Sequence, residues 1–163
     1  KNLGIPGVTL CIFEKGFPKE KNLTSYLNVE NHIGKNSAFN TPPTFSIYVM
    51  LKILEWFHET GGINNIEKNS KKKAKHLYDF LDENNQKLIL NVPKEYRSYS
   101  NIVFDFKNQK QTPLFLEESI NKGFIGLGGH RSVGGVRVSN YNSIDFKMIE
   151  EFIHHLKSFL SNN

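Results

Sequence analysis

The sequence is poor in cysteine: Cys11 is the only one among 163 residues, so no internal disulfide can form. Such sparing use is typical of a reducing compartment, and we expect Cys11 to be a buried spacer within an apolar run. The sequence also lacks a run of eighteen apolar residues, which argues against a transmembrane helix. It has no basic segment leading into an apolar one at its start, so no signal peptide is recognised. These absences indicate a cytoplasmic protein without a membrane partner.

An initiator methionine is also absent, and the chain opens directly on loop-like and strand-like sequence. We therefore expect a fragment, a processed product or the ordered part of a longer protein. The length of 163 residues is about that of one ordinary domain, and a hydrophobic content of 38% is enough to bury a core.

Positive charge is in modest excess, with a formal net charge of +5. Two features that typify nucleic-acid-binding proteins are missing, namely an arginine stripe and an aromatic stacking platform. The densest basic run, Lys71–Lys75, lies in a helical stretch, where we expect a solvated face. We therefore expect no nucleic-acid partner. No set of His, Cys, Asp and Glu residues has the spacing of metal ligands, so we expect no metal site.

Arginine is scarce and unevenly distributed, since only three of the twenty-one basic residues are arginines. Two of them, Arg131 and Arg137, lie six residues apart in the glycine-rich segment GGHRSVGGVR, beside His130. Planar guanidinium groups bind carboxylates and phosphates through two parallel hydrogen bonds, which lysine cannot do. The segment therefore indicates an anion site for a small acidic molecule. The alternative is a tight turn whose arginines form surface ion pairs.

The first sixty or so residues contain few expected elements. Val8–Phe13 reads as a buried strand, because it is a short apolar run with β-branched residues, and Gly16–Ser37 reads as loop. A helix follows, for which Thr41 is the expected N-cap and Pro42 the first residue, and Gly61-Gly62 ends it. Its N-terminus is a second candidate anion site, although the plainer interpretation is a capped helix and nothing more.

From Gly62 onward the pattern runs helix, strand, strand, helix, strand, strand, helix. This order favours an α+β module in which a mainly antiparallel sheet is covered by helices on one face. One strand and one long helix cannot enclose a core, so the residues before Gly62 read as the tail of another domain. The expected helices are Ile63–Asn84, Pro113–Lys122 and Asp145 to about Leu160, and the expected strands are Leu88–Val92, Asn101–Phe106, Phe124–Leu127 and Val136–Ser139.

Lysine and histidine have plain as well as functional interpretations. Lys1 precedes a glycine- and proline-rich turn, and it could form a Schiff base if its ammonium lost its proton readily, although a terminal lysine by itself indicates nothing. His130 could bind phosphate, act in acid–base chemistry or simply hydrogen-bond the turn. His154 and His155, on the last helix, are expected at the surface.

Three segments together resemble the phosphoserine aminotransferases, a family of pyridoxal-phosphate enzymes among the fold-type I aminotransferases. They are KN-x-G-x-PGVT at Lys1–Thr9, FNTPPTFSIY at Phe39–Tyr48 and GHRSVGGVRVSNYN at Gly129–Asn142. Their order and separations fit the family, and the last segment is specific. The resemblance covers nearly the whole chain but only the carboxy-terminal half or so of the family's length. It implies an α/β fold in which residues 1–61 are the tail of the large cofactor-binding domain and residues 62–163 the small α+β domain.

The resemblance implies pyridoxal 5′-phosphate as the cofactor and assigns residues to it. Lys1 matches the lysine that holds the cofactor through a Schiff base and then moves the proton between substrate and cofactor. Asn40 and Thr41 match residues that reach the cofactor phosphate across a dimer interface. The implied assembly is a homodimer with shared active sites.

The resemblance also assigns the substrate contacts. His130 and Arg131 match residues that contact the substrate phosphate from the partner subunit, and Arg137 matches the arginine that grips the substrate α-carboxylate. Two nearby arginines then serve one substrate with two anionic groups. The implied reaction transfers an amino group between glutamate and 3-phosphohydroxypyruvate, giving O-phosphoserine and 2-oxoglutarate in serine biosynthesis.

Two other functions compete with this one. The family's first half carries the aromatic that stacks on the cofactor and the aspartate that pairs with its ring nitrogen, so we expect little or no transaminase activity from these 163 residues alone. The chain could instead be a non-catalytic module that binds an anion or a partner protein. A related transaminase for a different acidic substrate is a third possibility, but His130 beside Arg131 suits a phosphate.

Overall fold

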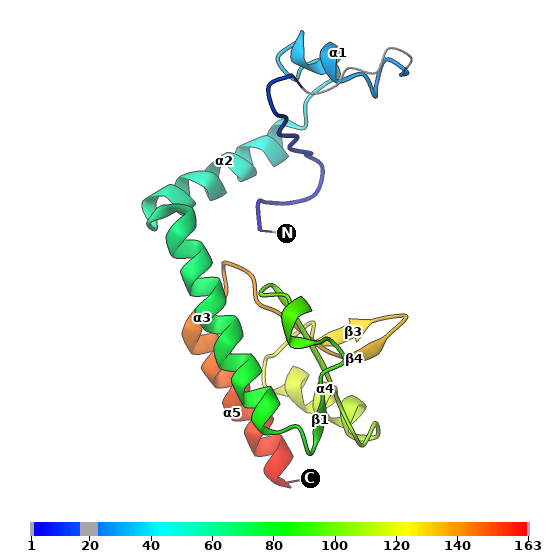
Figure 1. Ribbon diagram of the computed structural model, residues 1–163, viewed down its shortest axis with the longest axis vertical. Coiled ribbons are helices and arrows are strands. Elements are labelled where there is room, and N and C mark those ends of the chain that lie inside the picture. Colours follow the sequence, from blue (N-terminus) through cyan, green and yellow to red (C-terminus); the bar gives the residue numbers. More distant parts are fainter. Residues whose placement is uncertain (1, 17–22, 163) are drawn as a thin grey trace. The chain divides into compact units, whose positions relative to one another are not determined.

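The computed structural model describes residues 2–16 and 23–162, which form two compact units (Figure 1). Unit 1 comprises Leu3–Trp56, and unit 2 comprises Phe57–Asn163 together with Asn2. Unit 1 holds helix α1 (Val29–Ile33) and most of helix α2 (Thr44–Glu59), and its described residues contain no strand. All the sheet structure that the described residues form therefore lies in unit 2.

The expected strand at residues 8–13 is absent, because these residues have no regular secondary structure. Leu10 and Ile12 are 53% and 87% exposed, and Cys11 is exposed instead of being a buried spacer. A strand needs a neighbour to take up its backbone hydrogen bonds, and the described residues of unit 1 offer none. The strand prediction is wrong for this reason, even though the run is apolar.

Helix α2 begins at Thr44, so Thr41 is not its N-cap and Pro42 is not its first residue, contrary to the sequence prediction. Proline disfavours the helical conformation in the residue that precedes it. Thr41 precedes Pro42, and Pro42 precedes Pro43, so the helix starts only after the second proline. Asn40 and Thr41 therefore lie in the approach to the helix and not in its first turn.

The junction after α2 and the loop before it depart slightly from expectation. α2 ends ahead of Gly61, whose φ of +95° suits glycine, but Gly62 begins helix α3 (Gly62–Glu83) instead of closing α2.

The segment Gly16–Ser37, predicted as loop, contains the short helix α1. This helix is capped by Asn28, whose side chain accepts a hydrogen bond from the Glu30 N–H at 3.0 Å. Residues 17–22 of that loop lie outside the described residues.

Unit 2 contains a four-stranded antiparallel sheet in the order β1-β2-β4-β3. The antiparallel sheet and the succession of helices and strands confirm the α+β prediction. The strands are β1 (Leu88–Ile89), β2 (Asn101–Phe106), β3 (Gly128–His130) and β4 (Gly134–Ser139), and the helices after α3 are η1 (Lys94–Tyr96), α4 (Gln111–Asn121) and α5 (Phe146–Asn162).

One face of the sheet is buried beneath the helices, as the sequence predicted. Burial alternates along β2 and β4, because successive side chains of a strand point to opposite faces. Figure 1 shows α3 and α5 side by side, and α4 joins them in the same core. The central members of this core are Ile102, Phe104 and Phe106 of β2, Val136 and Val138 of β4, and Leu77, Phe115 and Leu156 of the helices.

The segment Phe124–Leu127, predicted as a strand, is not one, and β3 begins instead at Gly128. Phe124 packs against the core, and its N–H donates to the Ser119 carbonyl at 2.9 Å, which closes the end of α4. The apolar run therefore returns the chain from helix to sheet, and pairing starts only where β4 lies alongside. β1 is also shorter than predicted, since only its two residues pair with β2.

Lys73 departs from the solvated face expected for the basic run of α3, because only 4% of its area is exposed. Its Nζ donates hydrogen bonds to the carbonyl oxygens of Tyr141, at 2.9 Å, and Ile144. Burial lowers the pKa of Lys73, and the carboxylate of Asp145 opposes that effect. Lys73 thus fastens the segment that leaves β4 onto α3.

His155 also departs from expectation, because it is buried, with 3% of its area exposed. Its ring stacks on Phe115 with a centroid separation of 5.0 Å, and its Nε2 lies 2.9 Å from Oγ of Ser119. Burial lowers the pKa of His155, the charge of Lys122 lowers it further, and the carboxylate of Glu118 opposes both. The folded protein therefore keeps this imidazole neutral over a wider pH range than the unfolded chain does.

We expect the free energy of unfolding to fall as the pH drops below 6.5, the ordinary pKa of histidine. The unfolded chain then binds a proton that His155 in the folded protein takes up only at lower pH, so the contribution of His155 to stability is fully present above that value. His155→Gln should make the decline between about pH 6.5 and 5 shallower. His154→Gln, at the exposed neighbouring position, should leave it unchanged. Urea denaturation across this range measures the slopes, and identical slopes in both variants would contradict the expectation.

Candidate functional site

The glycine-rich segment folds as a tight hairpin formed by β3 and β4 (Figure 1). His130 pairs with Gly134 at the end of the ladder, and the N–H of Val133 donates to the His130 carbonyl at 2.9 Å. The three residues between the strands, 131–133, form the loop. The structure therefore places His130 and Arg131 at the tip of the hairpin, where both are exposed.

Glycine is required in this hairpin because the two strands approach very closely. A Cβ atom on Gly129 would lie 1.7 Å from the carbonyl oxygen of Gly134. Gly134 itself has a φ of +76°, which other residues rarely adopt. The glycines of the motif thus have a structural reason that is independent of any ligand.

Arg137 lies on the face of the sheet opposite the helices. Its neighbours Val136 and Val138 point into the core, and Arg137 is paired with Val103 of β2. Its Nε is buried and has no hydrogen-bond partner in the structure. Leaving a buried donor unpaired is costly, and a carboxylate is the group that best satisfies a guanidinium fork. The geometry therefore fits a bound carboxylate at Arg137.

The third arginine, Arg97, shows what a structural arginine looks like in the same fold. Its two terminal nitrogens each donate to a carboxylate oxygen of Asp82 at 2.8 Å, and its guanidinium lies 4.9 Å from the ring centroid of Tyr78. The hydrogen bonds from Arg97 lower the pKa of Asp82. Among residues 2–16 and 23–162, no acidic side chain makes such a pair with Arg131 or Arg137. Within the described part of the chain, neither arginine therefore forms the surface ion pair that the alternative interpretation requires.

Two residues that sequence reasoning did not single out support the hairpin. The Oγ of Ser132 lies 2.8 Å from Nδ1 of His130. Asn140 is 1% exposed; its N–H donates to the Ser100 carbonyl and its side-chain amide to the Tyr99 carbonyl, both at 2.8 Å. Asn140 thus fixes the end of β4 beside the start of β2. Neither role has a signal in the sequence, because both depend on contacts made by the folded chain.

The predicted site residues are divided between the two units. His130, Arg131 and Arg137 are brought together by the hairpin of unit 2. Asn40 and Thr41 lie in unit 1, and both are exposed. Lys1 lies outside the described residues.

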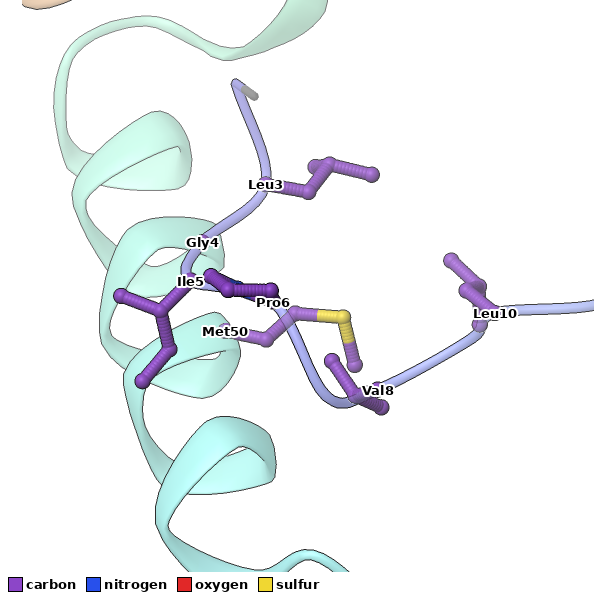
Figure 2. A pocket seen from close by; sticks show the side chains of 7 residues that line it. All are labelled: Leu3, Gly4, Ile5, Pro6, Val8, Leu10 and Met50. Atoms are coloured by element: carbon purple, nitrogen blue, oxygen red, sulfur yellow. The ribbon is translucent and has the colours of Figure 1, made fainter.

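A pocket of about 450 Å³ in unit 1 is chemically unlike this site (Figure 2). Figure 2 shows side chains such as Ile5, Leu10 and Met50 around it, and none of the lining residues is ionisable. Such a lining suits apolar groups and offers no charge to an anion. We therefore assign the candidate site to the hairpin and not to this pocket.

The described part of the chain offers no membrane span and no metal centre. None of its helices is long and apolar enough to cross a membrane. Nor do its His, Cys, Asp and Glu side chains form a group of three or more that could hold a metal ion.

Comparison with known proteins gives consistent matches. The chain is 39% identical over 161 residues to the phosphoserine aminotransferase of Shouchella clausii, covering 98% of this chain and 44% of that protein. It superposes with a TM-score of 0.85 and 36% identity on a phosphoserine aminotransferase solved to show radiation damage of its Schiff base, covering 89% and 41% of the two chains. A pyridoxal-phosphate-bound phosphoserine aminotransferase from Trichomonas vaginalis matches with a TM-score of 0.78 and 28% identity over 86% and 40%.

The chain thus spans less than half the length of the proteins it matches. The family model for class-V aminotransferases matches residues 1–152, which is nearly the whole chain. This match confirms the family resemblance seen in the three sequence motifs, and the chain belongs to the aminotransferase class-V family.

Proposed function

We propose that this chain is the carboxy-terminal part of a phosphoserine aminotransferase. The proposed enzyme transfers an amino group between glutamate and 3-phosphohydroxypyruvate, giving O-phosphoserine and 2-oxoglutarate in serine biosynthesis. The observation that carries the proposal is the buried, unpartnered Nε of Arg137, a few residues from the exposed pair His130 and Arg131. A substrate with one carboxylate and one phosphate needs two separate cationic groups of this kind.

Arg137 would bind the substrate α-carboxylate. The sheet fixes its backbone on both sides, through pairing with Val103 and through its own N–H, which donates to the Leu127 carbonyl at 2.7 Å. The backbone from which the guanidinium extends is therefore fixed, and two parallel hydrogen bonds to a carboxylate would orient the substrate. His130 and Arg131 would bind the phosphate from the hairpin tip.

The residues assigned to pyridoxal 5′-phosphate have chemistry that fits it. The cofactor, when bound, supplies the electron sink for amino-group transfer. The amide of Asn40 and the hydroxyl of Thr41 are exposed donors suited to a phosphate, and the nearby N-terminus of α2 favours negative charge. Lys1 would hold the cofactor covalently and move the proton at the substrate Cα.

The proposal includes an assembly and a location. We assign residues 1–61 to the end of the large cofactor-binding domain and residues 62–163 to the small domain. The enzyme would work in the cytoplasm as a homodimer, in which Asn40, Thr41, His130 and Arg131 of one subunit serve the active site of the other. Unit 1 supports this assignment, because large side chains such as Phe45, Tyr48 and Leu51 of α2 are 69%, 55% and 49% exposed and leave apolar surface available for contact.

A non-catalytic anion- or partner-binding role is the second candidate. It is favoured by one observation: among the described residues, every buried apolar residue belongs to unit 2, so this unit has a core of its own. A module of this kind would need neither the cofactor nor the rest of the enzyme.

Intact mass after borohydride reduction separates the two candidates. We expect a purified protein of about twice the 18.8 kDa of this chain, because the chain spans 44% of its relative, with one reduced pyridoxyl group attached. Borohydride fixes a Schiff base irreversibly, and peptide mapping should place the added mass on Lys1. A mass matching this chain with no adduct would favour the non-catalytic role.

Replacing Arg137 with Ala in the full-length protein should mainly weaken substrate binding. We expect kcat/KM to fall by the equivalent of about 2–5 kcal/mol, since the substrate carboxylate loses a desolvated charge partner. Arg97→Ala is the matched control, because it removes the ion pair with Asp82 and should lower stability without changing KM. Steady-state kinetics and urea denaturation measure the two effects. Unchanged kinetics in Arg137→Ala would remove this residue from the site.

Replacing Arg131 with Ala should harm phosphorylated substrates more than glutamate. The guanidinium at the hairpin tip is assigned to the phosphate, which glutamate lacks, so the loss should be selective. The ratio of kcat/KM for phosphoserine to that for glutamate measures this selectivity. Equal losses for both substrates would argue against the phosphate role of Arg131.

A further inference from the structure

Ser132 approaches the imidazole of His130 with two of its groups. Its Oγ lies 2.8 Å from Nδ1, and its backbone N–H donates to the same nitrogen at 3.3 Å. A backbone N–H can only donate, so Nδ1 must be the acceptor in this arrangement. A neutral imidazole whose Nδ1 accepts carries its proton on Nε2.

The hairpin holds this arrangement in place. His130 is the last paired residue of β3, opposite Gly134, and the N–H of Val133 donates to the His130 carbonyl. Ser132 lies between these two anchored positions, in a loop of only three residues. Its hydroxyl therefore stays beside the ring, where the serine Oγ–H and the backbone N–H share the single lone pair of Nδ1, and the hydroxyl lies at the shorter distance.

The other ring nitrogen of His130, Nε2, is left available for a ligand. His130 is exposed, and no group among residues 2–16 and 23–162 hydrogen-bonds its Nε2. An Nε2–H is a donor, which suits the oxygens of a phosphate, whereas an Nε2 lone pair would repel them. The tautomer thus decides whether His130 helps Arg131 to bind the anion or opposes it.

We propose that Ser132 is a positioning residue, which holds His130 in the Nε2–H tautomer so that the imidazole donates a hydrogen bond to the substrate phosphate. This inference rests on the proposed function, because it takes phosphate as the ligand of His130 and Arg131. Ser132 itself need not touch the substrate. Its role is to keep one donor ready and correctly oriented before the substrate arrives.

The tautomer can be measured without any ligand. Nitrogen-15 NMR of the purified protein, at a pH where the ring is neutral, distinguishes a protonated from an unprotonated ring nitrogen. The spectrum of His130→Gln identifies the signals of His130 among those of the other histidines. We expect Nε2 to be protonated and Nδ1 unprotonated in the wild type. Ser132→Ala keeps the weaker backbone N–H contact to Nδ1 but loses the shorter hydroxyl contact, so we expect it to show a mixture of the two tautomers. A wild-type spectrum with the proton on Nδ1 would overturn the proposal.

Titration with inorganic phosphate, followed through the same signals, tests the consequence for binding. We expect Ser132→Ala to raise the Kd for phosphate about threefold to tenfold, because part of the population presents a lone pair in place of a donor. Ser132→Thr retains the hydroxyl and should restore the affinity. Val133→Ala, at a position 73% exposed in the same loop, is the matched control and should leave the Kd unchanged.

The outcomes separate this inference from the proposed function. Wild-type affinity in Ser132→Ala would overturn the positioning role, while leaving phosphate binding by His130 and Arg131 intact. Equal weakening in Ser132→Ala and Val133→Ala would mean that the loop was merely disturbed, and this too would overturn it. No response of wild-type His130 to phosphate would overturn the phosphate role that the proposed function assigns, and the positioning role with it.

Discussion

The antiparallel pairing of β2 with β4 is the constraint on which the rest of unit 2 depends. Its register places Val103 opposite Arg137 and Ile102 opposite Val138. Because the side chains of a strand alternate between faces, this register sends Val136 and Val138 into the core and leaves Arg137 on the other side. A slip of one residue would bury the guanidinium among phenylalanines, which the apolar core could not accommodate. The same strand register therefore both forms the core and places the Arg137 side chain on the opposite face of the sheet.

In the proposed function, the hairpin would divide anion recognition between a rigid part and an exposed part. Arg137 lies within strand β4 of the sheet, and its buried Nε has no hydrogen-bond partner in the structure. Arg131 lies at the tip, where it is exposed, directly after His130, the last paired residue of β3. A carboxylate common to every amino-acid substrate suits the fixed site, and a phosphate that distinguishes one substrate suits the exposed one. Specificity would then be adjustable at the tip without disturbing the sheet.

The two units differ in how they are stabilised. Unit 2 has a hydrophobic core of its own, and its buried polar side chains have hydrogen-bond partners. Lys73 and Asn140 donate to backbone carbonyls, and His155 lies within hydrogen-bonding distance of Ser119. Unit 1 buries only Ser46 below the surface among its described residues. The hydrophobic effect thus acts mainly within unit 2, and unit 1 exposes apolar groups such as Ile12 that a structured partner surface could cover.

The sequence by itself determined the features that depend on local pattern. These are the helices of unit 2, strand β2, the antiparallel class of the sheet, and the arginine motif with its family resemblance. The cap at Asp145 is another, because its Oδ1 accepts a hydrogen bond from the Met148 N–H at 2.8 Å. Tertiary structure decided what depends on distant neighbours. Among the described residues no strand lies beside the apolar run Val8–Phe13, so it forms none, and His155, unlike His154, faces the core. The tautomer of His130 and the unpaired Nε of Arg137 were equally invisible beforehand. Propensity and spacing act along the chain, whereas burial, pairing and hydrogen-bond satisfaction exist only once distant residues meet.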